Sequence, residues 1–319
     1  MIIEFENIRR VLKLKLLLLP ALLFFSLKQA SAQQDPQYSQ YMFNQLVINP
    51  AFAGSKDAIS TTLVVRTQWV GIAGAPNTQT FSIHTPLSKK KIGIGFHVVA
   101  DQIGPVKSTG AFGSYAYKIQ LPKGKLALGL RLGVYQYVYD WGAITHYDPI
   151  DNVYLHNNST YYVPSADFGL YYSNSDMYIG LSVTQLFNGR ISSITEPNGD
   201  YSSFVPHEFL TFGKAFDVSS SILLNPSFVI KTALNSPYSA DLNMNVLIDR
   251  RVWAGLSYRT DFGLVLLTAV NITAECRVGY SFDWGFSQLT TFTGGSHEVS
   301  LAYNFGTLHR SNVFSPRYF

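Results

Sequence analysis

The stretch Leu126–Val138, LALGLRLGVYQYV, alternates between two kinds of residue along its length. Leucine or valine stands at every second position from Leu126 to Val134, and alanine, glycine, arginine and tyrosine occupy the positions between. Successive side chains of a β-strand point to opposite faces, so this period of two predicts a strand with one apolar face and one small or polar face.

The same period recurs along the chain and predicts an all-β fold. We expect fourteen strands, at residues 58–70, 77–86, 91–101, 107–121, 124–139, 161–174, 176–186, 207–217, 220–233, 238–248, 250–260, 262–273, 275–284 and 296–305. The number is even, as in single-chain bacterial outer-membrane barrels, and open sheet edges are not tolerated in lipid. We therefore predict a transmembrane outer-membrane β-barrel of 14 antiparallel strands.

The connections between these segments support a barrel. Every second connection is a tight turn, at Pro86–Lys91, Pro122–Lys123, Ser175, Val218–Ser219, Asp249 and Ala274. The three long connections, 139–160, 186–206 and 285–295, all belong to the other set. Outer-membrane barrels have short periplasmic turns and longer extracellular loops, so the pattern predicts a periplasmic N-terminus.

The first 32 residues have the features of an export signal. A basic segment precedes the apolar run Leu16–Leu27, and Ala30–Ala32 offers a cleavage site before Gln33. Removing the segment discards five basic and two acidic residues and leaves 19 basic and 18 acidic ones. The remaining net charge of +1 gives no basic face for nucleic acid. We expect export and cleavage near Ala32/Gln33, followed by insertion into the outer membrane of a Gram-negative cell.

The predicted organisation is a signal peptide (1–32), an N-terminal periplasmic arm that could also plug the barrel (33–57), the barrel (58–305) and a periplasmic tail (306–319). The arm is aromatic, rich in amides and nearly uncharged. Its side chains could pack in the lumen or against a partner. The candidates for plugging or partner binding in the arm and tail are Tyr38, Tyr41, Phe43, Asn49, Pro50, Phe52, Gly54, Arg317, Tyr318 and Phe319.

Polar residues on the lumen side of the strands allow two interpretations. They could line a conducting pore or form a hydrogen-bonded network inside the barrel, and their mixed charges favour the network because buried charges need partners. The candidates are Arg66, His97, Arg131, Asp167, Asn243, Asn245, Arg277, Asp283 and Glu298. The four tryptophans fall near strand ends and suit an interfacial aromatic belt; they are Trp69, Trp141, Trp253 and Trp284.

The sequence offers little support for catalysis. It contains no HExxH or GxSxG motif. His146 and His156 share a long loop with Asp148 and Asp151, but that loop is also rich in asparagine and tyrosine, as solvated loops are. We expect no catalytic residue, cofactor or metal.

The N-terminal stretch DPQYSQYMFNQLVINPAFAG (Asp35–Gly54) gives the chain a specific resemblance. Together with Arg66, Gln68 and Trp69, the segments TQTFSIHTPL (78–87) and SHEVSLAYNF (296–305), the turn Val99–Pro105 and the terminal SPRYF, it resembles the PorP/SprF family of the Bacteroidota. The resemblance implies an outer-membrane barrel of the type IX secretion and gliding-motility machinery.

The resemblance also implies partners. These are the periplasmic ring and peptidoglycan-binding components of the apparatus, and the C-terminal domain of a secreted protein or adhesin, with outer-membrane lipid around the barrel. We therefore predict a non-enzymatic docking or anchoring subunit. The alternative is an outer-membrane diffusion channel or a transporter of hydrophobic, fatty-acid-type ligands, because fourteen strands and a plug suit that role as well.

Overall fold

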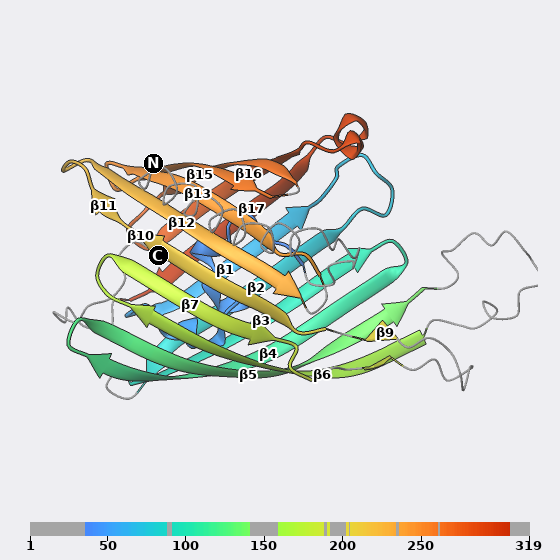
Figure 1. The fold of residues 1–319 in the computed structure, drawn as a ribbon, viewed down its shortest axis with the longest axis horizontal. Coiled ribbons are helices and arrows are strands. Elements are labelled where there is room, and N and C mark those ends of the chain that lie inside the picture. Colours follow the sequence, from blue (N-terminus) through green and yellow to red (C-terminus); the bar gives the residue numbers. More distant parts are fainter. Residues whose placement is uncertain are drawn as a thin grey trace, which may run out of the picture.

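A computed structural model describes residues 36–87, 91–140, 159–187, 190–191, 202–203, 205–233, 236–260 and 262–306. Fourteen strands form one closed antiparallel barrel, as predicted, and the first strand pairs with the last (Figure 1). They are β1 (Ile59–Thr67), β2 (Asn77–Leu87), β3 (Ile92–Ile103), β4 (Val106–Leu121), β5 (Gly124–Tyr139), β6 (Ser159–Ser173), β7 (Met177–Thr184), β10 (His207–Lys214), β12 (Ile222–Ala233), β13 (Ser239–Ile248), β14 (Val252–Arg259), β15 (Gly263–Asn271), β16 (Cys276–Gly285) and β17 (Ser296–Phe305).

The period of two separates an apolar exterior from a polar lumen. In β5, Leu130 and Leu132 are 57% and 65% exposed on the outer surface, whereas Arg131 between them is 5% exposed. The same division holds in β17, where Leu301 faces outward and Glu298 and Ser300 are buried. An apolar outer surface suits lipid, and the buried polar face requires partners inside the barrel.

The strand made of β10 and β11 (Phe216–Asp217) is interrupted opposite a proline of its neighbour β12. The pairing of β10 with β12 stops at Gly213 and Ser227 and resumes between Phe216 and Leu224, where β11 continues β10. Pro226 lies in the interval and has no N–H to donate to the neighbouring strand. A small hairpin of β8 (Arg190–Ile191) and β9 (Ser202–Ser203) stands apart from the barrel sheet and was not predicted.

The two ends of the barrel differ. The connections 122–123, 174–176, 218–221, 249–251 and 272–275 lie at one end, the short-turn end. The opposite, long-loop end carries the connection 286–295, which contains the turn η7 (Gln288–Phe292). In the described part of the chain, no helix is long and apolar enough to cross a membrane.

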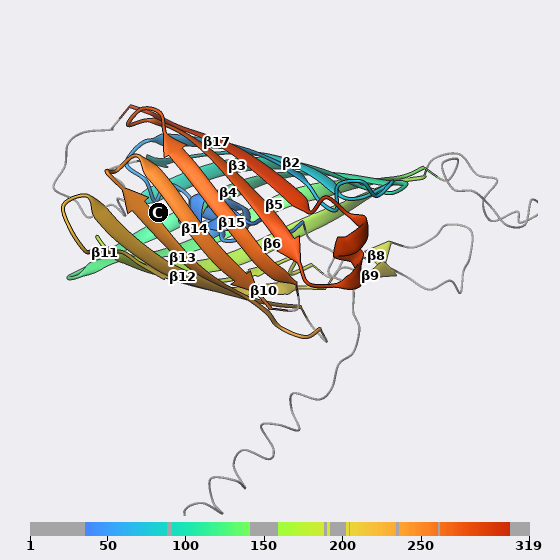
Figure 2. The same ribbon diagram turned by 90° about the horizontal axis from the view of Figure 1, so that it is seen from above.

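Residues 36–57 form an arm that lies inside the barrel (Figure 2). It contains three short 3₁₀ turns, η1 (Tyr41–Phe43), η2 (Gln45–Val47) and η3 (Pro50–Phe52). Every residue from Ser39 to Gly54 is buried. This stretch carries no charged residue, so it enters the lumen without the cost of desolvating an ion.

Candidate functional site

The arm runs the length of the lumen from the long-loop end to the short-turn end. Ser39 contacts Glu298 and Asp283, which stand close to the long-loop ends of β17 and β16. Gly54 donates its N–H to His84 Nδ1 at 3.1 Å, and its carbonyl accepts from Lys118 Nζ near the short-turn end. The arm predicted at the periplasmic end therefore reaches, inside the barrel, the opposite end of the strands.

Ser39, Gln40, Arg66, Asp283 and Glu298 form a buried group that we call the latch cluster. The backbone N–H groups of Ser39 and Gln40 each donate to one oxygen of Glu298 at 2.8 Å. Arg66 contacts Glu298 at 3.3 Å and Asp283 at 2.7 Å. The Ser39 hydroxyl accepts from Arg66 at 2.8 Å and donates to Asp283 at 2.7 Å. The arm's own backbone is thus part of an ion-pair network in the barrel wall.

Three further charged side chains extend the latch cluster along the wall. Arg259 contacts both oxygens of Asp241 at 3.1 Å and lies 3.4 Å from Asp283. Lys231 Nζ donates to Asp241 at 2.9 Å. Arg259 also donates to the Tyr38 carbonyl at 3.3 Å. The two groups together contain three cations and three carboxylates, so each buried charge has a neighbour of opposite sign. Removing one partner from such a network lowers the free energy of unfolding more than removing a whole pair does, because it leaves a buried charge without a partner.

A second ion pair holds the middle of the arm. Arg131 on β5 pairs with Asp167 on β6 through its Nε. Its Nη1 donates to the carbonyls of Leu46 and Val47 at 3.0 and 2.9 Å. These contacts satisfy backbone acceptors of η2, which has too few residues to satisfy them itself.

Glycines on the lumen face give the arm room to approach the wall. A Cβ at Gly129 would lie 2.1 Å from the Ala51 nitrogen, and a Cβ at Gly93 would lie 1.9 Å from the Ala53 oxygen. Both contacts are with backbone, which cannot turn aside as a side chain can. Gly129, which stands between two leucines in the sequence, and Gly93, between two isoleucines, therefore form part of the surface against which the arm packs.

Asn49 fixes the turn that begins η3. Its side-chain oxygen accepts the Ala51 N–H at 2.9 Å, and Pro50 occupies the first position of the turn. Its Nδ2 donates to the Leu170 carbonyl on β6 at 3.0 Å. One amide side chain thus caps a turn of the arm and attaches it to the wall.

Replacing Asn49 by alanine is expected to lower the free energy of unfolding by about 1–3 kcal/mol, because a cap is lost and buried groups lose partners. Urea unfolding of the barrel in lipid vesicles measures the change. Asn271→Ala is the matched control, since the Asn271 amide makes one exposed hydrogen bond to Arg250. Equal effects of the two substitutions would contradict the assigned role of Asn49.

Aromatic residues of the arm pack on wall residues rather than on one another. The Phe43 ring meets Trp253 edge-on at 5.6 Å, and the Arg277 guanidinium lies 3.9 Å from its centre. Phe52 makes edge-on contacts with His84 and Tyr171 at 5.3 and 5.4 Å. The prediction that Trp253 belongs to an interfacial belt is wrong, because Trp253 is 3% exposed and lies in the lumen against the arm.

The arm supplies almost no charge of its own inside the barrel. The Tyr41 phenol oxygen accepts a hydrogen bond from Asn243. Lys56 lies at the end of the arm, where burial and the charge of Arg277 lower its pKa to about 7. Since Ser39–Gly54 contains no charged residue, the charges that bind this stretch come from the barrel wall.

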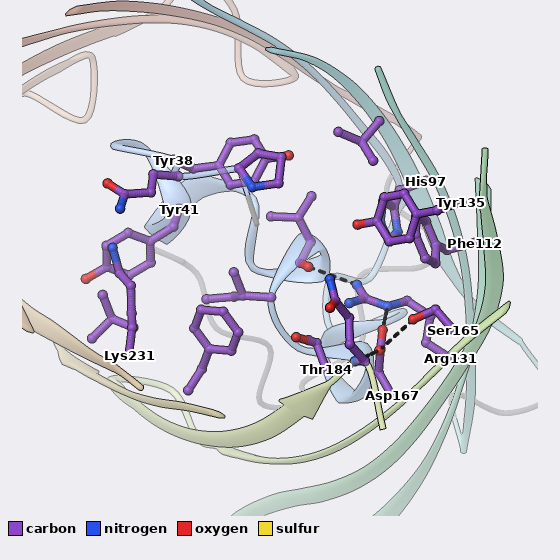
Figure 3. Close-up of a pocket in the computed structure, with 18 residues that line it drawn as sticks. Tyr38, Tyr41, His97, Phe112, Arg131, Tyr135, Ser165, Asp167, Thr184 and Lys231 are labelled. Carbon is purple, nitrogen blue, oxygen red and sulfur yellow. Dashed lines mark hydrogen bonds and ion pairs between the residues drawn. The ribbon is translucent and has the colours of Figure 1, made fainter. Parts of the chain in front are cut away.

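A cavity of about 50 Å³ remains between the arm and the wall (Figure 3). Tyr38, Phe112 and Tyr135 supply aromatic surface, and Arg131 and Asp167 supply charge. This volume holds roughly three to five water molecules, whereas sites for drug-sized ligands occupy about 300–1,000 Å³. With the arm in place, the lumen has no room for a large ligand at this point. Among the described residues, no group of three His, Cys, Asp or Glu side chains could hold a metal ion.

The family model for the type IX secretion system membrane protein PorP/SprF matches residues 30–303. The match covers the arm and nearly all of the barrel. The chain belongs to the PorP/SprF family. Membership and the barrel fold together indicate an outer-membrane protein of the type IX secretion system. No curated protein sequence matches the chain.

Solved structures similar to this PorP/SprF barrel are outer-membrane proteins with very different sequences. A Pseudomonas aeruginosa FadL homologue is 11% identical with a TM-score of 0.50, over 85% of this chain and 95% of that one. The CymD monoaromatic hydrocarbon channel is 11% identical with a TM-score of 0.48, over 83% and 94%. Acinetobacter baumannii Omp33 is 9% identical with a TM-score of 0.46, over 78% and 99%. At this identity, the likeness to the FadL homologue shows the barrel fold alone.

The structure brings most of the predicted residues of this PorP/SprF chain into one lumen. The nine predicted network residues lie on the lumen side, and Arg66, Asp283 and Glu298 meet in the latch cluster. Asn245 lies apart from it, against Gly255. Among the arm candidates, Tyr41, Phe43, Asn49, Pro50, Phe52 and Gly54 are buried and Tyr38 is half-buried. Arg317, Tyr318 and Phe319, and the loop with His146 and His156, lie outside the described residues.

Two lumen groups, Arg259 and Lys118, are absent from the residues predicted from the sequence. Arg259 shares its parity with Gly255 and Ser257, the small and polar face of β14, and this signal could have identified it. Lys118 likewise shares its alternate positions with Ser114 and Ala116 on the small and polar face of β4, but only the fold shows that its ammonium reaches the Gly54 carbonyl.

Proposed function

We propose that this PorP/SprF barrel is a non-enzymatic docking and anchoring subunit of type IX secretion. The observation that carries the proposal is the arm, which occupies the lumen and is attached to the wall by the latch cluster and by Arg131. A lumen filled in this way suits a subunit that acts through its surfaces. In outer-membrane barrels the long loops face outward. The long-loop end would then bind the C-terminal domain of a secreted protein or adhesin, and the short-turn end would meet the periplasmic ring and peptidoglycan-binding components.

Isolation of the native barrel from membranes with its bound proteins tests this proposal. We expect to recover components of the type IX apparatus or a protein that carries a type IX C-terminal domain. Isolation of the barrel without an apparatus component and without a protein that carries a type IX C-terminal domain would contradict the docking function.

A second candidate function is a diffusion channel or a transporter of hydrophobic ligands. The observation in its favour is the aromatic lining of the lumen cavity beside Tyr38 and Tyr135, which has room only for small molecules while the arm is in place. In planar bilayers, a transporter or channel gives large, steady, salt-dependent conductance without any protein ligand. The docking subunit is expected to give little conductance while its arm is in place.

Deleting Asp35–Gly54 separates the two candidates. The closed strand ladder remains, so the barrel is expected to insert still. Water would fill the emptied lumen and bilayer conductance would rise, whereas secretion would be lost because the arm is missing. Conductance and secreted protein are measured on the same variant, and heat-modifiable mobility on gels shows that it folds. Unchanged secretion would mean that the arm only leads into β1.

A further inference from the structure

Three connections at the long-loop end form one connected surface, which we call the rim platform (residues 68–76, 104–105 and 286–295). The Val70 N–H donates to the Gly295 carbonyl at 2.9 Å, and the Gly294 N–H donates to the Val70 carbonyl at 2.7 Å. The Gly104 N–H donates to the Gly74 carbonyl at 2.8 Å. These bonds between loops extend the order of the barrel beyond β1, β3 and β17. A surface ordered in this way loses little conformational entropy when it binds.

The rim platform exposes large apolar side chains. Phe292 is 77% exposed and Phe286 is 63% exposed. Other exposed apolar members are Val70 and Leu289. The three segments contain no Lys, Arg, Asp or Glu. Aromatic enrichment and depletion of charge mark the buried core of protein interfaces, and exposed apolar groups gathered at one place mark interaction sites.

The position and chemistry of the rim platform decide between its possible occupants. Attraction to anionic lipid headgroups depends on lysine and arginine, and the platform has neither. A second copy in the same membrane points in the same direction, so two platforms that project past the strand ends do not meet end to end (Figure 1). An uncharged apolar face of a folded domain outside the membrane matches the surface.

We propose that the rim platform is the docking surface for an uncharged, apolar face of the secreted partner's C-terminal domain. This inference rests on the proposed docking function and specifies its surface. Phe286 and Phe292 are its central contacts, and the adjoining loops give them a fixed base. Truncation of a central aromatic contact commonly weakens a protein interface by tenfold or more.

The test uses the full-length barrel in detergent and a purified C-terminal domain of a type IX substrate from the same genome. The double variant Phe286→Ser, Phe292→Ser is expected to weaken binding by at least about tenfold. Ile272→Ser is the matched control, because Ile272 is 63% exposed and lies in the 272–275 connection at the short-turn end, away from the platform. It is expected to change binding less than about twofold. Heat-modifiable mobility on gels shows whether each variant folds. If the double variant does not fold, Phe292→Ser alone takes its place in the binding measurement.

Each outcome has a distinct meaning. Binding by the unaltered barrel together with equal binding by the double variant would overturn the platform and leave the docking function in place. Absence of binding by the unaltered barrel would overturn the docking function and the platform with it. Loss of binding in lipid vesicles but not in detergent would assign the platform to lipid contact and overturn the inference.

Discussion

Replacing Arg66 by methionine is expected to lower the free energy of unfolding by about 3–5 kcal/mol, the cost of leaving buried charges without a partner. Arg66 is 1% exposed and contacts two carboxylates that are inaccessible to solvent, Asp283 and Glu298. Arg259, at 3.4 Å from Asp283, compensates only part of the loss. Urea unfolding in lipid vesicles measures the effect.

Two further variants make the Arg66 prediction specific. Arg251→Met removes an exposed arginine at the short-turn end and is expected to change stability by less than about 0.5 kcal/mol. The double variant Arg66→Met, Glu298→Gln removes a charge of each sign and is expected to recover part of the stability, because a neutral pair leaves no uncompensated carboxylate at Glu298. Equal stabilities of Arg66→Met and Arg251→Met would show that the latch cluster does not stabilise the barrel.

Replacing Gly129 by alanine is expected to displace the arm around η3. The new Cβ would lie 2.1 Å from the Ala51 nitrogen and 2.4 Å from its Cα, so the arm backbone has to move. Overpacking of this kind costs about 1–3 kcal/mol, and local opening of the arm is expected to increase by tenfold or more. Amide hydrogen exchange of residues 41–54, followed by mass spectrometry, measures that opening.

Gly113→Ala is the matched control for Gly129→Ala. Gly113 lies on β4 and faces outward, and a Cβ added there would meet no atom within 4 Å. Exchange of the arm is expected to stay unchanged in this variant. Faster exchange in both variants would point to a general loss of strand stability, and slow exchange in both would show that the arm tolerates the added methyl group.

Much of the barrel could be predicted from the sequence, because neighbouring residues of each strand show which face is apolar and which is polar. Leu126, Leu128 and Leu130 alternate with small or polar residues, and that alternation alone separates the lipid side from the lumen side. The strand count and the closure follow from the number of such segments and from the exclusion of open edges in lipid. The break at Pro226 depends on which neighbour the missing N–H would face, and a linear pattern does not give that direction.

The candidate site was less predictable, because its contacts join residues far apart in sequence. Arg66 meets Asp283 and Glu298 only when the barrel closes β1 on β17. Trp253 stands near a strand end, where an interfacial role is the usual expectation, and only the fold shows that Phe43 of the arm packs against it. The path of the arm through the lumen could not be predicted either, because a segment of short 3₁₀ turns has no sequence periodicity that indicates its direction.

By itself, the sequence determined the period of two, the fourteen strands, the polar face of the lumen and the nearly uncharged, aromatic character of the segment Asp35–Gly54. These properties are local, because each is set by a residue and its nearest neighbours along the chain. Only the tertiary structure decided that the arm fills the lumen up to the long-loop end, with its backbone bound to Glu298 and packed on Gly129. That arrangement requires charges and glycines from many strands to converge on one segment, and barrel closure brings them together.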